Sequence, residues 1–511
     1  MLDLTLILAS LGVILLLGYL LPSYRHVKHD SREPPLISSH IPALGHLVAF
    51  LYYGLRYFSQ KSAATPLPAF SIDMLVNKVY VINAPELVTA IRRNHRTMSL
   101  DPLFIRTAQC VGGIHGPGLQ LHRGKESHGQ GLGSAATAAL RPALLGEGLD
   151  QMNQKMTPLL ANSVEELRSQ HGAVNLYDWC TLAMTIASTA PVYGPKNPYA
   201  QSHVREAFWK VEHNLSFLMI GIAPWLIART AWKGREDLAR AFRQYYESGG
   251  HFDSSQMIYS RWKTQHEAGA SVDDIARLEI AMGLGILSNT IPTSFWVIFD
   301  IYSRPQLLRE IRNEICRNAL SITSEGIHTV DLADVQEKCP LLLSSIQETL
   351  RLRSNSLQLR VIYEDTLLAD SCLVKAGSLV VMPAAVINRN ESAWGPNANT
   401  FDPHRFVSAS QKRQKAAAYL SFGTSPHICA GRHFATAEIT ALLTMLIMQF
   451  EIRPVEGRWV EPVTNVNAVA ASLSPPVGST PVTFEEREEV KGVEWEFRLS
   501  PGRGTHGLIV G

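Results

Sequence analysis

The stretch Leu420–Glu438, LSFGTSPHICAGRHFATAE, places one cysteine, Cys429, in a loop of small and polar residues that leads into an apolar helical pattern. Apolar and small side chains recur at helical spacing from Phe434 onward, so the thiol is expected at or just before a helix N-terminus. The free N–H groups and the positive end of the helix dipole favour a thiolate there. Gly431 leaves room for a flat ligand, and Phe422 can cover the sulfur from the loop side. The stretch therefore indicates a single-thiolate metal ligand, with a buried, inert thiol as the alternative.

A second pair of polar residues, Asn289 and Thr290, lies inside a long segment that is apolar nearly all round. Ser271 with Asp274 resembles a capping box and predicts the start of a long, buried helix. Pro292 removes one hydrogen bond of that helix, so a hydroxyl, a water or a ligand is expected at the opening. A plain proline kink is the alternative.

A third feature is the pair Glu348 and Arg351, which share one face of a helix that Pro340 is well placed to start. This spacing alone is common on surface helices, but here leucines and an isoleucine surround it, which indicates a buried pair. Buried charges need further partners, and Arg405 in the segment FDPHRF offers a second guanidinium.

Composition narrows the class of protein. The chain has 511 residues, of which 46% are apolar and 18% charged, and its formal net charge of +2 gives no case for nucleic-acid binding. None of the six cysteines forms a C-x-x-C pair, so a zinc knuckle or a thioredoxin-like site is not indicated. Because the cysteines are scattered along the chain and form no disulfide framework, they are typical of a protein in a reducing compartment.

The N-terminal run Leu4–Leu21 carries no charge and approaches the about 20 residues that a membrane helix needs. Asp3 and the lack of a cleavage site argue against a secretory signal. Arg25 and Lys28 follow the run, and basic residues stay on the cytosolic side. A single-pass anchor with a cytosolic body is predicted, which in a eukaryote points to the endoplasmic reticulum membrane.

The expected organisation is a transmembrane anchor over residues 1–24, a Pro-rich hinge over 25–47 and one catalytic domain over 48–511. The domain is expected to be mostly α with small β-sheets, because residues 150–450 are largely helical in pattern and the last 55 or so favour short strands. The apolar segment Ser216–Trp232 is either a buried helix pair or a patch that dips into the membrane.

Taken in order along the chain, these elements resemble the cytochrome P-450 superfamily, and the resemblance covers essentially the whole chain. The motifs that carry it are the haem loop F-x-x-G-x-x-x-C-x-G at Phe422, Cys429 and Gly431, the E-x-x-R pair at Glu348 and Arg351, the P-E-R-F element at Pro403–Phe406 with His404 for Glu, and the acid–alcohol pair at Asn289 and Thr290. The resemblance implies the P-450 fold of the membrane-anchored eukaryotic type, with an N-terminal transmembrane helix.

The resemblance also implies the roles of individual residues. Haem b (iron protoporphyrin IX) would be the cofactor, with Cys429 as the ligand of its iron. Thr290 and Asn289 would be the catalytic residues. The implied cofactor-binding residues are Cys429, Phe422, His427, Gly431, Arg360, Glu348, Arg351 and Arg405.

Several departures from the family pattern are visible. Ser425 stands where the family usually has Gly, and His427 where it often has Arg, although a histidine can still hydrogen-bond a haem propionate. The usual W-x-x-x-R clamp is missing, with Arg141 or His122 as replacements and Arg360 as the better propionate partner.

Asn289 stands where the family usually has an acid. In this respect the chain resembles the branch that contains sterol 7- and 12-hydroxylases and prostacyclin synthase, where Asn also occurs at this position. An amide orients water but supplies no proton at neutral pH. A fungal member with a role in secondary-metabolite biosynthesis is expected.

The implied activity is a monooxygenase that inserts one oxygen atom from O2 into a C–H or C=C bond of a lipophilic substrate of terpenoid, steroid or polyketide type. Electrons would come from NADPH through a separate NADPH-cytochrome reductase or a cytochrome b-type donor. The basic run Gln411–Lys415 is either its docking surface or a solvated loop. A haem-thiolate isomerase or dehydratase without a reductase, and a non-enzymatic membrane haem protein, remain as alternatives. The pocket walls implied by the resemblance are Leu103–Leu119, Phe217–Leu226, Leu284–Leu287, Leu357 with Gln358, and Ala471–Leu473.

Overall fold

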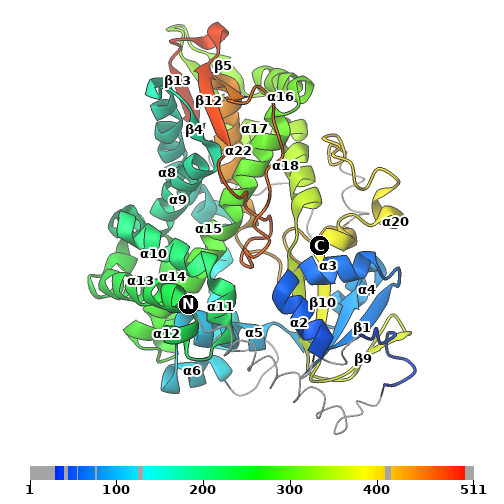
Figure 1. Ribbon diagram of the computed structural model, residues 1–511. Coiled ribbons are helices and arrows are strands. Elements are labelled where there is room, and N and C mark those ends of the chain that lie inside the picture. Colours follow the sequence, from blue (N-terminus) through cyan, green and yellow to red (C-terminus); the bar gives the residue numbers. More distant parts are fainter. Residues whose placement is uncertain are drawn as a thin grey trace, which may run out of the picture.

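The structure is a computed structural model that describes residues 29–39, 44–54, 56–74, 77–124, 131–408 and 416–500. Its longest helix, α15 (Val272–Tyr302), runs through the middle of the molecule with other helices around it (Figure 1). The Ser271 hydroxyl caps this helix by accepting the N–H of Asp274 at 3.1 Å, as the sequence predicted. Among the described residues α15 is the helix that is long and apolar enough to span a membrane, but 78% of its apolar window is buried inside the protein, so it is the core helix.

Four more long helices contact α15, and a fifth, α8, packs on two of them. They are α8 (Gly146–Glu165), α9 (Leu176–Tyr193), α13 (Arg229–Glu247), α18 (Pro340–Arg353) and α22 (Arg432–Gln449). Proline begins α18 at the predicted position. The shorter helices are α2 (Leu44–Tyr53), α3 (Arg56–Ala63), α4 (Pro85–Arg93), α5 (Asp101–Thr107), α6 (Gly116–Arg123), α7 (Leu132–Leu140), α10 (Ser202–His213), α11 (Leu215–Ile220), α12 (Pro224–Ile227), α14 (Gln256–Glu267), α16 (Pro305–Asn318), α17 (Leu332–Lys338), α19 (Ala384–Ile387) and α20 (Glu391–Trp394).

The sheets are small, and the largest joins strands from distant parts of the sequence. Its order is β1 (Ala69–Met74), β2 (Asn77–Ile82), β10 (Leu379–Pro383), β7 (Leu357–Ile362) and β3 (Met98–Ser99). The β2–β10 pair is parallel and the others are antiparallel. Figure 1 shows the blue strand β1 and the yellow strand β10 in this one sheet.

The remaining strands form smaller sheets, and the late ones confirm the expected strands after residue 450. One sheet has the order β11 (Phe450–Pro454), β12 (Pro481–Glu486) and β4 (Val174–Asn175). Another has β13 (Trp495–Arg498), β6 (His328–Asp331) and β5 (Leu320–Ile322), and β8 (Thr366–Leu368) pairs with β9 (Cys372–Val374).

The predicted anchor, residues 1–24, lies outside the described residues. The described part of the predicted hinge is fastened to the large sheet, since Leu36 forms a β-bridge with Ser71 and the carboxylate of Glu33 accepts the Tyr80 hydroxyl at 2.6 Å. Helix α2 already begins at Leu44. The division into anchor, hinge and domain stays a prediction.

The apolar segment 216–232 forms the short helices α11 and α12 and the start of α13. Ile222, Trp225 and Leu226 are 67%, 62% and 75% exposed, so these side chains face away from the protein core. This exposure favours the surface-patch interpretation over a buried helix pair.

Candidate active site

Cys429 lies three residues before the start of α22 at Arg432, as the helical spacing predicted. We call residues 420–431 the cysteine loop. The N–H of Cys429 donates to the carbonyl of Phe422 at 2.8 Å, and the Arg432 guanidinium donates to the carbonyl of Cys429 at 3.0 Å. Gly423 has φ +81°, and a Cβ there would meet the His427 carbonyl at 3.0 Å, so the tight return of the loop requires glycine.

A cavity of about 400 Å³ separates α15 from the cysteine loop and α22. Six of the sequence-predicted site residues border it, namely Asn289, Thr290, Phe422, His427, Cys429 and Gly431. The Cys429 side chain is exposed because it faces this cavity, although the surrounding protein encloses it. That burial raises the pKa of the Cys429 thiol, while the N–H of Gly431 and the charge of Arg432 act in the opposite direction.

The cavity leaves open space at two glycines on opposite walls. At Gly285 on α15 and at Gly431 in the cysteine loop, an added Cβ would meet no atom within 4 Å. Gly285 is exposed even though it lies in the central helix. A flat group therefore has room between the two elements.

Only some of the predicted pocket walls border the cavity. Ile286, Gln358 and Leu473 do, in three of the predicted segments. The expectation for segments 103–119 and 217–226 is wrong. The first packs against the first half of α15, where Arg277 donates to the Gly112 carbonyl at 3.3 Å and Leu278 forms one buried cluster with Ala108, Ile114 and Leu119. The second exposes most of its apolar side chains at the surface.

Arg360 on β7 is buried beside the cysteine loop without a carboxylate partner in the described part of the chain. It is 2% exposed, and its guanidinium donates only to the carbonyls of Thr424, at 2.9 Å, and Leu359, at 2.7 Å. Burial lowers its pKa to about 10. Because a buried cation without an anion is costly, this guanidinium marks a place for a negatively charged group.

Two more basic residues adjoin the cysteine loop near Arg360. Burial and then the charge of Arg360 lower the pKa of His427 to about 4, so its neutral ring offers a hydrogen bond rather than a charge. Arg141 donates to the Pro426 carbonyl at 3.1 Å. His122 is buried elsewhere and does not border the cavity. Of the two candidates for the missing clamp, Arg141 is therefore the one beside the loop.

Helix α15 stays continuous through Pro292. The Thr290 hydroxyl donates to the Ile286 carbonyl at 3.0 Å, and the Thr293 hydroxyl donates to the Asn289 carbonyl at 2.7 Å. Neither hydroxyl donates to the Ser288 carbonyl, which Pro292 leaves without its helical N–H, so the predicted partner at that opening stays a prediction. Thr290 also borders the cavity, so its hydroxyl lies where a bound molecule can contact it.

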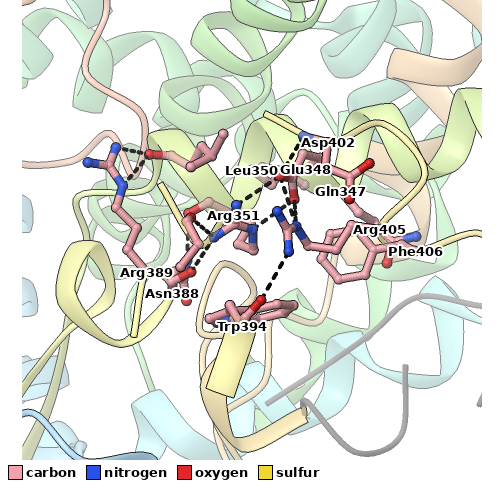
Figure 2. A network of polar contacts seen from close by, with 12 residues as sticks. Gln347, Glu348, Leu350, Arg351, Asn388, Arg389, Trp394, Asp402, Arg405 and Phe406 are labelled. Carbon is pink, nitrogen blue, oxygen red and sulfur yellow. Dashed lines mark hydrogen bonds and ion pairs between the residues drawn. The ribbon is translucent and has the colours of Figure 1, made fainter. Parts of the chain in front are cut away.

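Glu348, Arg351 and Arg405 form the predicted buried ion cluster (Figure 2). The Arg351 guanidinium donates to both Glu348 carboxylate oxygens, at 2.7 and 2.8 Å, and Arg405 Nε donates to Glu348 Oε1 at 3.1 Å. Arg351 also donates to the carbonyls of Asn388 and Ala398. Glu348 and Arg351 are both 0% exposed, and every charge in the cluster has several partners.

None of these three charged side chains borders the cavity, and neither does Arg360, so their expected place among the cofactor-binding residues stays a prediction. Asn388, which sequence reasoning missed, connects the cluster to the cysteine loop. It accepts the N–H of Leu420 at 2.7 Å and donates to the Ser421 hydroxyl at 3.1 Å. Nothing in the sequence around Asn388 signals this role, because its partners lie more than thirty residues away. The cluster therefore positions the loop.

Sequence reasoning also missed two features of the cavity wall. Asn289 Oδ1 accepts the N–H of Ser472, 183 residues away, at 2.7 Å. Glu438 on α22 borders the cavity and is 1% exposed, and its Oε1 has no hydrogen-bond partner among the described residues. Burial raises the pKa of Glu438 to about 8.

The site fits a thiolate-bound haem. It offers one thiol at a helix N-terminus, space for a flat group between two glycines, and a buried guanidinium without an anion. Within the described ranges, no group of three or more His, Cys, Asp or Glu side chains could hold a metal ion.

Comparisons with known proteins agree with this geometry. The family model for cytochrome P450 matches residues 34–478. The cytochrome P450 monooxygenase nodJ of Hypoxylon pulicicidum is 41% identical over 495 residues, which cover 94% of this chain and 95% of that protein. A cytochrome P450 monooxygenase of Gibberella zeae is 27% identical and covers 84% of this chain and 83% of that protein. The cholesterol 7-alpha-monooxygenase of Cricetulus griseus is 25% identical over 49% of this chain and 52% of that protein.

The chain belongs to the cytochrome P450 family. The predicted family, the mostly α fold with small sheets and the monooxygenase class are confirmed, and the Hypoxylon and Gibberella relatives are fungal proteins.

Proposed function

We propose that this protein is a haem-dependent monooxygenase of secondary-metabolite biosynthesis that inserts one oxygen atom into a C–H or C=C bond of a lipophilic substrate. The observation that carries the proposal is the cavity that joins Cys429, at the N-terminus of α22, to Asn289 and Thr290 on α15. The related proteins described as monooxygenases support the same class.

Haem b would be held by Cys429 as the iron ligand, with Phe422 beside the sulfur and Gly431 leaving space for the ring. Arg360 would bind a propionate by charge, and His427 by a hydrogen bond. When bound, the haem supplies the oxidising chemistry with O2 and two electrons, because a thiolate ligand favours O–O cleavage. The Thr290 hydroxyl, which borders the cavity, would hold a water molecule there and relay a proton from it into the cavity.

The substrate is proposed to be lipophilic because aliphatic and aromatic side chains make up much of the cavity lining. These side chains orient the substrate by shape and exclude water. The sterol-oxidising relative agrees with this substrate class.

Electrons are proposed to come from NADPH through a separate reductase in the endoplasmic reticulum membrane. The predicted docking run, residues 411–415, lies outside the described residues, as does the predicted anchor. The exposed apolar side chains of α11 and α12 support membrane association, and Tyr52 on α2 adds a further ring that is 78% exposed. Figure 1 places α2 and α12 toward the same end of the molecule.

The test of this function is a coupled turnover experiment in microsomes that contain the full chain and an NADPH-cytochrome reductase. Candidate lipophiles are incubated with NADPH and ¹⁸O2, and product mass is measured. We expect products that gain one labelled oxygen, in proportion to the NADPH consumed. Turnover of a peroxide substrate without reductase or NADPH, with no labelled oxygen gained, would instead establish the isomerase alternative.

The proposed membrane arrangement is tested separately on the same microsomes. A glycosylation acceptor sequence added at the N-terminus is expected to be modified, while added protease digests the catalytic domain. An unmodified N-terminus, or a protected domain, would contradict the proposed single-pass topology.

A further inference from the structure

Two side chains on one face of α15 form hydrogen bonds with the backbone of the same extended segment near the C-terminus. Asn289 Oδ1 accepts the N–H of Ser472 at 2.7 Å, and the Trp296 indole N–H donates to the carbonyl of Ser474 at 2.9 Å. The two side chains are seven residues apart, which is about two helical turns, so they project from the same face of the helix. The extended segment is therefore attached to the central helix at two points.

The same segment is also held from its other side. The N–H of Asn355, just after α18, donates to the carbonyl of Ser472 at 2.6 Å, and Ser354 forms a β-bridge with Leu473. Both backbone polar groups of Ser472 are thus used, one by α15 and one by the chain that follows α18. The Ser472–Asn289 hydrogen bond is partly buried, and a backbone N–H that loses its acceptor there is costly, so the segment is expected to move if Asn289 is shortened.

This hydrogen-bonded segment forms part of the cavity wall, because Ser472 and Leu473 both border the cavity. Asn289 borders it as well, but its carboxamide oxygen is occupied by Ser472. The group that remains is an amide NH2, which donates hydrogen bonds and has no acidic proton to transfer near neutral pH.

We propose that Asn289 is a positioning residue that holds the Ser472–Leu473 wall and thereby determines which part of the substrate lies nearest the reactive centre. This replaces the sequence-based expectation that Asn289 serves in the proton relay, and leaves that role to Thr290. The inference rests on the proposed monooxygenase function, but the contact itself can be tested without turnover.

The test uses haem-loaded full-length protein and three variants. Asn289→Ala removes the acceptor, Asn289→Asp keeps an oxygen acceptor at the same position, and Trp296→Phe keeps an aromatic ring but removes the second attachment point. Hydrogen exchange of the peptide that contains Ser472 is followed by mass spectrometry, and the positions of oxidation in the product are determined.

For Asn289→Ala we expect about five-fold faster exchange of the Ser472 amide and oxidation at additional substrate positions. Asn289→Asp is expected to retain the exchange rate and the product pattern of the unchanged protein. Trp296→Phe is expected to broaden the product pattern in the same way as Asn289→Ala.

The proposal is wrong if Asn289→Ala leaves the exchange and the product positions unchanged and only lowers the product formed per NADPH, since that is the result expected of a relay residue. It is also wrong if Asn289→Asp speeds the exchange as much as Asn289→Ala. If the exchange data follow the expectation but no protein variant, including the unchanged protein, oxidises a substrate, the positioning contact stands and the proposed function fails.

Discussion

The Glu348 cluster and the cavity beside Cys429 lie close together, but they treat buried charge in opposite ways. In the cluster, Glu348 and Arg351 have no exposure, and each charge is matched by an opposite charge or by carbonyl groups (Figure 2). Beside the cysteine loop, Arg360 is buried without a carboxylate, and at the cavity Glu438 has an oxygen without any partner, both within the described part of the chain. Complete pairing marks a cluster that maintains the fold, whereas incomplete pairing marks a place where a bound group supplies what is missing.

The largest expected effect is a loss of stability, which results from breaking the fully paired Glu348 cluster. Glu348→Ala leaves two buried guanidinium groups without their carboxylate, so we expect a loss of about 3–5 kcal/mol in the free energy of unfolding and a low yield of haem-loaded protein. Thermal unfolding and the haem content of the soluble fraction measure this. The matched control is Glu461→Ala, which breaks an ion pair with Arg353 at the surface and should cost less than about 1 kcal/mol. Equal losses in the free energy of unfolding for both variants would contradict the distinction between the fully paired buried cluster and the surface ion pair.

The next effect concerns the incompletely paired guanidinium of Arg360 beside the cysteine loop. Arg360→Met is expected to destabilise the fold far less than Glu348→Ala, but to release haem about ten-fold faster, because a charge-assisted hydrogen bond to a propionate is lost. Transfer of haem to an excess of apomyoglobin measures the rate. Arg360→Lys should be intermediate, since it keeps the charge but not the planar fork. An unchanged release rate in Arg360→Met would remove Arg360 from the propionate site.

A third prediction concerns the pH dependence that Glu438 causes. Its pKa is about 8 in the folded protein, raised by burial from an ordinary 4.5, so the folded state binds the proton more tightly than the unfolded state. This group therefore favours folding fully below about pH 4.5, and its contribution falls as the pH rises towards 8.

Glu438→Gln removes this dependence. Relative to the unchanged protein, we expect its unfolding temperature to rise progressively between pH 5.5 and 8.5, by the equivalent of a few kcal/mol. If the difference in unfolding temperature between Glu438→Gln and the unchanged protein stayed constant across this range, Glu438 would not titrate there.

The last prediction concerns the coupling of NADPH use to product formation. Thr290→Ala removes the hydroxyl that borders the cavity, so we expect NADPH use to continue while the product formed per NADPH falls by roughly ten-fold, less than the loss of a complete acid–base catalyst would cause. Ser294→Ala is the matched control, because its hydroxyl donates to the Thr290 carbonyl but does not border the cavity. Unchanged coupling in Thr290→Ala would remove its proposed role.

The sequence predicted best what local chemistry determines. Ser271 caps the start of the central helix, Pro340 begins α18, and the residues after Cys429 form α22, because caps and prolines act within a few residues of their position. The Glu348–Arg351 pair was also visible, since three residues along a helix place two side chains on one face.

What the sequence did not predict depends on contacts between distant segments. The Asn289–Ser472 hydrogen bond joins residues 183 apart, and the link from Asn388 to the cysteine loop has no local pattern. The positions of segments 103–119 and 217–226 were wrong for a related reason. Apolar composition is typical of a cavity wall, of a buried packing surface and of a surface patch alike. Only the packing of segment 103–119 against the first half of α15 and the exposure of α12 distinguish them.

The central claim, that the Cys429 thiolate binds the haem iron, is tested most directly by the absorption spectrum of the reduced carbon monoxide complex. We expect the strongly red-shifted band of a thiolate-bound haem in the unchanged protein and in Cys316→Ala, whose cysteine is exposed on α16 away from the cavity. Cys429→Ala is expected to lose that band. If Cys429→Ala kept the red-shifted band, or if the unchanged protein bound no haem, the account would be contradicted.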